Sequence, residues 1–310
     1  MMETSLISGI RTFVSVAEVW VPYDGKLILK EGNYGALDDF AAASQSESFA
    51  FGEGLPGKAW ADAKPTVLKT MSGSYFKRLQ PAQAADLTSG VAIPVFAGAE
   101  LRAVLVVLCS DDNERVGAIE VWCQVNGMMV LDDGYYGAAK HFEWVSQHTH
   151  FPRGQGLPGG VWAAATPMLF RDLGSGYRFV RADSAGKAGL TNGLGIPVPV
   201  PGSEAYVLTL LSARGTPIAN RFEIWDARSA KVGSTNKAVL IDGICANEGV
   251  LWDDENPRMA DAYKGIVGKV LASGIPAVEY KSAGTFGYDS VVALPIHQSG
   301  ELSHIVAWYC

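Results

Sequence analysis

The sequence predicts an α+β protein made of three consecutive repeats, each an antiparallel β-sheet with short helices and loops on one face. The phrase GEGLPGKAW (Gly52–Trp60) returns 102 residues later as GQGLPGGVW (Gly154–Trp162). Trp20, Trp122 and Trp225 recur at spacings of 102 and 103 residues along the 310-residue chain, which indicates internal repetition. In each unit two strand-like segments precede the helices and two follow them, an order typical of α+β folds.

The repeats divide the chain into a first domain at 1–113, a second at 114–216 and a third, degenerate one at 217–310. The segment AEVWVPYDGKLILKEGNYGA begins at Ala17 and matches IEVWCQVNGMMVLDDGYYGA, which begins at Ile119. Only short polar linkers separate the copies. We therefore expect the second copy to be soluble when it is expressed alone.

The elements of the first copy follow from local signals. AEVWVP and KLILKE flank Asp24-Gly25 and predict a β-hairpin. GALDDFAAASQS has a helix-forming composition, and the glycine phrase introduces KAWADA, a helix with Pro56 at its first position. SGSYFKRLQPAQAADL is predicted to be partly helical, with an interruption at Pro81. GVAIPV and LRAVLVVLC form a second hairpin around FAGAE.

The third copy departs from this plan. It begins at FEIW and has 19 residues from Pro276 to Pro295, against 29 from Pro65 to Pro94 in the first copy. The F-x-R segment that precedes the second hairpin has no counterpart there. Any pocket in the third copy must therefore be built differently.

The succession G-x-G-L-P-G-x-x-W, F-x-R and I-P-V resembles the GAF domain, a small-molecule-sensing fold. This resemblance covers nearly the whole chain, and it implies small-molecule sensing or signalling. Some relatives of this fold are enzymes, but no G-x-S-x-G pattern nominates a hydrolytic triad here, so we expect a non-enzymatic protein. The phrases are Gly52–Trp60, Phe76 with Arg78 and Ile93–Val95 in the first copy, and Gly154–Trp162, Phe179 with Arg181 and Ile196–Val198 in the second.

The resemblance nominates pocket residues but no catalytic or metal-binding ones. The two tryptophans of the glycine phrase could line the base of a pocket, or they could pack a helix against the sheet. The arginines of F-x-R could clamp a carboxylate or phosphate, or cap a helix end or form a surface pair. The candidate ligand-binding residues are Trp60, Tyr75, Phe76, Arg78, Trp162, Tyr177, Phe179 and Arg181.

The glycine phrase also satisfies G-x-G-x-x-G, the dinucleotide-binding pattern. That pattern needs a hydrophobic strand leading into the glycines. SESFAF before Gly52 is a poor strand, and HTHFPR before Gly154 contains a proline. We expect the glycines to provide positive φ and close backbone approach where the loop turns into a helix.

Other polar clusters predict no chemistry. His148 and His150 could ligate zinc, but the first copy has Ser46 and Ser48 there, so a solvated loop is the better interpretation. The acidic runs, among them Asp132-Asp133, lack the spacing of a calcium loop and are expected on the solvated surface.

The four cysteines have no C-x-x-C spacing and predict a reduced, cytoplasmic protein. Cys109 and Cys123 lie in strands with no neighbouring Lys or Arg in the sequence, which does not favour a reactive thiolate. A thiol-dependent reductase of the methionine sulfoxide reductase type is therefore the last of three hypotheses. A scaffold with vestigial pockets that binds other proteins is the second.

The composition limits the classes of partner that we expect. The net charge is −7 and the 25 basic residues are dispersed, so nucleic acid is not expected. No apolar run approaches the length of a membrane span, so no membrane is expected. The partners that remain are an unidentified small molecule, a second copy of the chain or a separate output protein. No residue pattern identifies a cofactor.

Two strands are apolar on both faces. RAVLVVLC (Arg102–Cys109) and AYVLTLLS (Ala205–Ser212) are almost continuously apolar, so each needs cover on both sides. GAF relatives cover the second side with long terminal helices. Here only the N-terminus offers one, with apolar residues at helical spacing from Leu6 to Val14. We predict that the uncovered faces pack against each other, between copies or across a homodimer.

Overall fold

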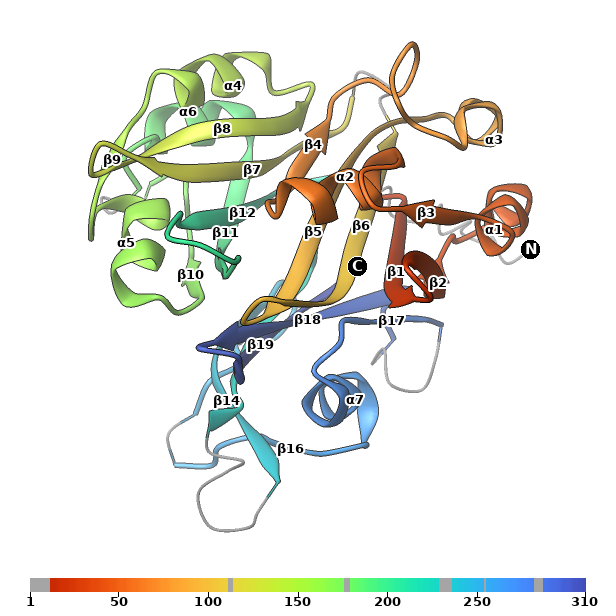
Figure 1. The fold of residues 1–310 in the computed structure, drawn as a ribbon. Coiled ribbons are helices and arrows are strands. Elements are labelled where there is room, and N and C mark those ends of the chain that lie inside the picture. The colour runs from red at the N-terminus through yellow and green to blue at the C-terminus, as the bar shows by residue number, and fades with distance from the viewer. Residues whose placement is uncertain (1–11, 111–113, 176–178, 229–235, 254, 282–286) are drawn as a thin grey trace, which may run out of the picture.

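Three antiparallel sheets, each made from the strands of one repeat, surround a common centre (Figure 1). The computed structural model describes residues 12–110, 114–175, 179–228, 236–253, 255–281 and 287–310. In every sheet the two hairpins lie side by side, because the first strand of the repeat pairs with its last strand. The predicted α+β class is confirmed.

The first sheet has the strand order β3-β2-β1-β6-β5-β4. Its strands are β1 (Val16–Tyr23), β2 (Lys26–Asn33), β3 (Ser48–Ala50), β4 (Thr66–Leu68), β5 (Leu87–Ala97) and β6 (Glu100–Ser110). Asp24 and Gly25 both have positive φ in the turn of the first hairpin, as the sequence predicted.

The second sheet repeats this order as β9-β8-β7-β12-β11-β10, and the third is β15-β14-β13-β19-β18-β17 with β16 also paired to β14. The strands of repeat 2 are β7 (Val116–Val125), β8 (Met128–Gly137), β9 (Phe151–Pro152), β10 (Met168–Phe170), β11 (Leu190–Val198) and β12 (Tyr206–Ala213). Those of repeat 3 are β13 (Arg221–Asp226), β14 (Lys237–Cys245), β15 (Gly249–Val250), β16 (Met259–Asp261), β17 (Ala277–Tyr280), β18 (Ser290–Gln298) and β19 (Glu301–Tyr309).

The helices cover the outer face of each sheet. They are α1 (Asp38–Gln45), α2 (Gly54–Asp62) and α3 (Leu79–Ala84) in repeat 1, α4 (Lys140–Gln147), α5 (Gly156–Ala164) and α6 (Ala182–Ala188) in repeat 2, and α7 (Gly265–Ser273) in repeat 3. Two expectations need correction. Pro56 is the third residue of α2 rather than its first, and Pro81 lies within the first turn of α3 instead of interrupting a helix. A first turn tolerates proline because its N–H groups have no partner within the helix.

The glycines of the repeated phrase have the expected role. Gly52 and Gly54 have φ of 79° and 60°, and a Cβ on Gly57 would lie 2.2 Å from the Ala50 carbonyl oxygen. The equivalent glycines of repeat 2 have the same geometry. Positive φ turns the chain, and the missing Cβ lets the helix start contact the preceding strand.

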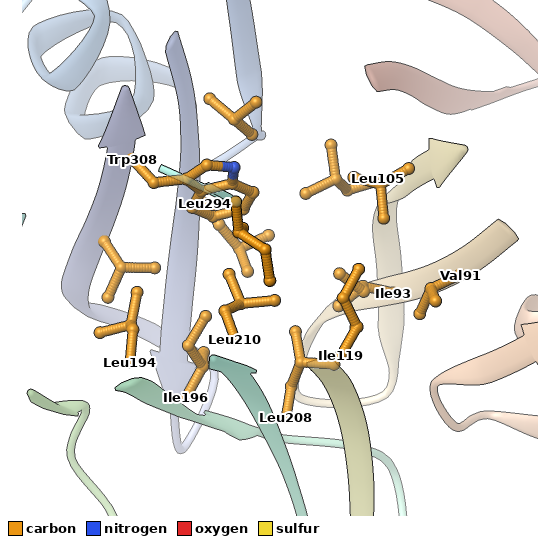
Figure 2. Close-up of a cluster of buried hydrophobic side chains, with 14 of the residues drawn as sticks. Val91, Ile93, Leu105, Ile119, Leu194, Ile196, Leu208, Leu210, Leu294 and Trp308 are labelled. Atoms are coloured by element: carbon orange, nitrogen blue, oxygen red, sulfur yellow. The ribbon is translucent and has the colours of Figure 1, made fainter. Parts of the chain in front are cut away.

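The inner faces of all three sheets meet in one hydrophobic core (Figure 2). The residues of β6 alternate between cores: Leu105 and Val107 enter this central core, while Val104 and Val106 enter the outer core of repeat 1. The prediction that uncovered faces pack against each other between copies is confirmed. The residues labelled in Figure 2 are Val91, Ile93, Leu105, Ile119, Leu194, Ile196, Leu208, Leu210, Leu294 and Trp308.

Polar contacts close the three repeats into a ring. An acidic residue occupies the same place in each sheet, opposite the residue that precedes the repeated tryptophan. Each of these acids forms an ion pair or a hydrogen bond with a group of the preceding repeat around the ring. The contacts are Lys69 Nζ to Asp133 at 2.9 Å, Arg171 to Asp242, and the Val278 backbone N–H to Glu31 at 3.1 Å.

This ring gives one acidic run a role. Asp132 is exposed and Asp133 is half-exposed, as expected for the solvated surface, and there they pair with lysines of repeat 1, Lys64 and Lys69. The helix expected at Leu6–Val14 lies mostly outside the described residues. Its described part is not helical, and Phe13 is fully buried in the central core.

Candidate functional site

Each repeat carries a buried glutamate two residues before its repeated tryptophan. Glu18, Glu120 and Glu223 are at most 1% exposed. In every copy the tryptophan Nε1–H donates to the glutamate Oε2, at 3.0 to 3.1 Å. A β-bulge at the tryptophan is present in all three first strands. Such a buried charge is stable only with a counter-charge and hydrogen bonds.

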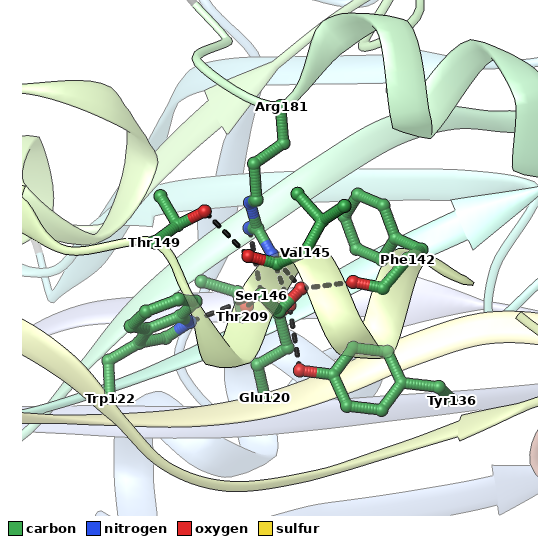
Figure 3. Close-up of polar contacts among 9 residues, drawn as sticks. All are labelled: Glu120, Trp122, Tyr136, Phe142, Val145, Ser146, Thr149, Arg181 and Thr209. Carbon is green, nitrogen blue, oxygen red and sulfur yellow. Dashed lines mark hydrogen bonds and ion pairs between the residues drawn. The ribbon is translucent and has the colours of Figure 1, made fainter. Parts of the chain in front are cut away.

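Arg181 provides the counter-charge in repeat 2 (Figure 3). Its Nη1 and Nη2 atoms each donate to one carboxylate oxygen of Glu120, with Nη2 to Oε2 at 3.0 Å. Nη1 also donates to Ser146 Oγ on α4. The Tyr136 hydroxyl and the Thr209 hydroxyl donate to the same glutamate at 3.1 and 2.7 Å.

Repeat 1 has the same arginine, glutamate and serine, but Val106 takes the place of Thr209. Arg78 binds both oxygens of Glu18 and also donates to Ser44 on α1. Four aromatic rings surround each guanidinium, with ring centroids 4.6 to 5.7 Å from Cζ in the two repeats. Each arginine thus clamps a carboxylate bidentately, but the carboxylate belongs to its own repeat.

The electrostatics of the cluster favour the ionised pair. Burial raises the pKa of the Glu120 carboxyl, but the Arg181 guanidinium and the hydrogen bonds outweigh this effect and hold the pKa below its usual range. Burial, together with the charge of Glu120, raises the pKa of Tyr136 far above its usual range. The hydroxyl of Tyr136 therefore stays protonated and remains a donor.

Repeat 3 lacks F-x-R, and a different arginine replaces it. Arg221 lies on the same strand as Glu223, and its Nε donates to Glu223 Oε1 at 2.7 Å. The Tyr309 hydroxyl donates to Glu223 Oε2 at 3.0 Å. In the other copies, the residue two positions before the glutamate is Val16 in repeat 1 and Ala118 in repeat 2. The buried negative charge is thus compensated in every repeat, even where the helix is lost.

The candidate residues from the sequence occupy two environments. Phe76 and Phe179 are buried beside the arginines. Trp60 and Trp162 are half-buried on α2 and α5, and Trp60 packs against the core of repeat 1. Tyr75 is 42% exposed. Tyr177 lies outside the described residues, and a role in ligand binding stays a prediction for all of these residues.

A cleft of about 790 Å³ opens beside the Arg78 cluster in repeat 1. We call it the repeat 1 cleft. It lies among the segment after β2, the segment after β4, α3 and the ends of β5 and β6. The lining is rich in hydroxyl and amide groups: Ser15, Tyr34, Thr70, Ser72, Gln83, Thr88 and Ser110, with Asp86 and Arg115 as charged groups.

Side chains connect this cleft to the buried cluster. Tyr34 lines the cleft and packs on Phe40, with ring centroids 6.1 Å apart. Phe40 in turn lies 4.8 Å from Arg78 Cζ. Leu79, which directly follows Arg78, lines the cleft as well. The F-x-R segment therefore forms one wall of this cleft through the residue that follows the arginine.

The corresponding place in repeat 2 is only partly closed. Its Ala188, Thr191 and Ala213, at the positions of Ala85, Thr88 and Ser110, line a cleft of about 1070 Å³ that extends to repeat 3. The part beside α6 is filled. Gly174 and Gly186 stand where repeat 1 has Ser72 and Gln83, and a Cβ on Gly174 would lie only 2.9 Å from the Gly186 Cα. The backbone of α6 therefore contacts the segment after β10 directly. Repeat 1 and repeat 2 share the buried cluster but differ in the cleft beside it.

Sequence reasoning missed the glutamates, although a signal was present. The pattern E-x-W occurs in all three copies as EVW, EVW and EIW. A charged residue repeated within an apolar strand needs a partner, and the arginine of F-x-R recurs as the same residue in both copies that have the helix. Pairing the two motifs would have predicted the cluster.

The histidines and acidic residues considered as metal ligands do not form a site in the described part of the chain. His148 is exposed and contacts the carbonyl of Trp144. Within the part of the chain that the structure describes, no three His, Cys, Asp or Glu side chains come together as metal ligands. No helix in the same residues is long and apolar enough to cross a bilayer.

No family model and no curated protein matches the chain. Similar solved structures include the GAF domain of a Coxiella burnetii phosphoenolpyruvate-protein phosphotransferase, with 19% identity, a TM-score of 0.27, and coverage of 31% of this chain and 56% of that one. The A. aeolicus nlh2 GAF domain has 19% identity and a TM-score of 0.26 over 31% and 58% of the chains.

A third neighbour is the free methionine-R-sulfoxide reductase of Neisseria meningitidis, solved in complex with its substrate. It has 16% identity and a TM-score of 0.25, over 31% of this chain and 52% of that one. The chain thus matches little more than half the length of these neighbours.

Proposed function

We propose that this protein is a non-enzymatic small-molecule receptor whose binding site is the repeat 1 cleft. The observation that carries the proposal is the cleft itself, about 790 Å³ in volume and lined by hydroxyl and amide groups. That volume lies within the range of small-molecule sites. The lining favours a ligand with several hydrogen-bonding groups.

The comparison between repeats supports a specific role for repeat 1. Repeat 2 has the same Arg–Glu cluster, but there two glycines in contact fill the part that Ser72 and Gln83 line in repeat 1. The cluster is therefore compatible with either arrangement and acts as a support. In repeat 1 it holds α1 and α3 on either side of an opening, through Ser44 and the arginine that precedes α3.

The thiols give little support to the reductase alternative. Burial raises the pKa of Cys109 and of Cys310 to about 12, and burial also raises the pKa of Cys123. A thiolate nucleophile needs a pKa near or below neutrality. If the protein nevertheless reduced methionine sulfoxide, replacing Cys109 and Cys123 with serine would abolish the activity.

Native mass spectrometry of freshly purified protein tests the receptor proposal. We expect a bound small molecule on the wild type and its loss in Ser72→Trp, because the exposed Ser72 lines the cleft and an indole would fill it. Lys187→Trp is the matched control, since Lys187 is exposed on α6 of repeat 2. This variant should retain the molecule.

Two results would count against the proposal. One is a wild-type protein with no added mass after gentle purification and with no stabilisation by a metabolite extract. The other is an equal added mass on Ser72→Trp. Either result would favour the scaffold hypothesis, in which the cleft is vestigial and the protein acts through its surface.

A further inference from the structure

A second cleft, of about 500 Å³, lies between repeat 2 and repeat 3. We call it the 2–3 cleft. Repeat 2 contributes α5 with Trp162 and the loop between β11 and β12. Repeat 3 contributes Arg228 and the turn between β18 and β19. Clefts between packed domains are frequent sites for small ligands.

Loop lengths explain why this cleft exists. The β11–β12 loop of repeat 2 spans residues 199–205, and its Val200 packs against the outer core of repeat 1. The equivalent turn of repeat 3 has only Ser299 and Gly300. It reaches α5 through Gln298, which donates to the Ala165 carbonyl. A two-residue turn leaves the space beside Trp162 unfilled.

The cleft combines an aromatic wall with two opposite charges. Trp162, Pro197 near the end of β11 and Pro199 of the β11–β12 loop provide apolar surface. Glu204 lies on the repeat 2 side and accepts a hydrogen bond from Tyr206 at 2.6 Å. Arg228 lies on the repeat 3 side and is held by Asp226 at 2.8 Å. An aromatic ring with an ammonium and a carboxylate group complements all three features.

We propose that the 2–3 cleft binds a free α-amino acid with an aromatic side chain. The ring packs on Trp162, the ammonium group pairs with Glu204 and the carboxylate pairs with Arg228. This site shares no lining residue with the repeat 1 cleft, so it does not depend on the receptor function proposed for that cleft. Because both repeats hold the ligand, its binding would strengthen the contact between them.

Three related probes separate the three contacts in ligand-observed NMR titrations of the full chain. L-Phenylalanine has both charges, phenethylamine lacks the carboxylate and phenylacetate lacks the ammonium group. Glu204→Gln should weaken the binding of L-phenylalanine and phenethylamine about threefold and leave the binding of phenylacetate unchanged. Arg228→Gln should weaken the binding of L-phenylalanine and phenylacetate to the same extent and leave the binding of phenethylamine unchanged.

The aromatic contact has its own pair of variants. Trp162→Leu should weaken the binding of all three probes about fivefold, the factor expected for a lost aromatic pair. Trp144→Leu is the control, because Trp144 is 56% exposed on α4 and lies outside the cleft. Ser72→Trp in the repeat 1 cleft should change none of the titrations.

Two results would overturn the proposal directly. In one, the wild type does not bind L-phenylalanine saturably. In the other, the binding is unchanged in both charge variants. Equal weakening by Trp144→Leu would show non-specific binding, and loss in Ser72→Trp would place the probe in the repeat 1 cleft. Since Glu204 and Arg228 are exposed, their variants test the idea even if Trp162→Leu fails to fold.

Discussion

At the residue scale, the buried Arg–Glu pairs couple distant parts of each repeat. Glu120 comes from the first strand and Arg181 from the segment before α6, 61 residues later. Ser146 on α4 joins the same guanidinium. An ionised pair in such a place is stable only as a complete unit, because each charge is costly to bury alone.

Glu120→Gln should therefore destabilise the protein strongly. The change leaves the Arg181 guanidinium buried without its counter-charge, and we expect a loss of about 3–5 kcal/mol in the free energy of unfolding. Denaturant titration measures the loss. Lys187→Gln breaks the exposed pair with Asp183 and should cost under about 0.5 kcal/mol. Similar losses in both variants would contradict the assigned role of the cluster.

The same pair predicts a pH dependence. The pKa of Glu120 is lowered in the folded state, so its contribution to stability is present above the ordinary glutamate value of 4.5 and is lost as the pH falls through the lower, folded pKa. We expect the free energy of unfolding of the wild type to decline with acid below about pH 4.5. In Glu120→Gln this decline should be shallower, as measured by denaturant titration from pH 3 to 6.

At the element scale, the loop that leads into α2, α5 and α7 has the same backbone in all three repeats. Gly52 and Gly154 begin it with φ of 79° and 84°, and Tyr263 stands at the equivalent place with φ of 70°. Gly268 approaches the Asp261 carbonyl as Gly57 approaches that of Ala50. A tyrosine in this conformation is strained, since its Cβ crowds the backbone.

Tyr263→Gly should therefore stabilise the protein. The tyrosine is 78% exposed, so little packing is lost. Relief of the left-handed strain, less the extra chain entropy of glycine, should raise the free energy of unfolding by about 0.5–1 kcal/mol. The midpoint of thermal unfolding measures the change, with the converse change Gly52→Ala as a destabilising control. A lower midpoint in Tyr263→Gly would show that the ring contributes contacts.

At the scale of the whole molecule, the three sheets depend on one another. β12 sends Leu208 and Leu210 into the central core and Val207 and Leu211 into the outer core of repeat 2. The outer core is complete within the repeat, but the central core needs all three. This arrangement revises the expectation that the second copy is soluble by itself, because an isolated copy exposes its inner face.

An excised repeat tests this interdependence. We expect residues 114–216 to aggregate or to bind a hydrophobic dye, as judged by light scattering and dye fluorescence, while the full chain stays monodisperse. Changing Ile196, Leu208 and Leu210 to threonine should restore a monodisperse repeat, because these side chains face the central core. A monomeric, dye-negative wild-type repeat would contradict the shared core.

Much of the repeat architecture could be predicted from local signals. The turn at Asp24-Gly25, the positive φ of Gly52 and Gly54 and the helix at Asp38–Gln45 follow from steric and propensity rules that act over a few residues. The proline positions were less well predicted, because a helix boundary depends on capping and packing that shift it by a turn.

The residue pattern alone predicted three repeated units and a need for cover on both faces of β6 and β12, because the repeat period and the run of apolar residues can be read from residue types without any contact. The packing of the three sheets established what provides that cover, which carboxylate Arg78 and Arg181 bind, and that the space beside α3 in repeat 1 is filled beside α6 in repeat 2. Those outcomes depend on side chains that are far apart in the chain and on the length of loops that pack against another repeat. Their energies arise only when the sheets come together.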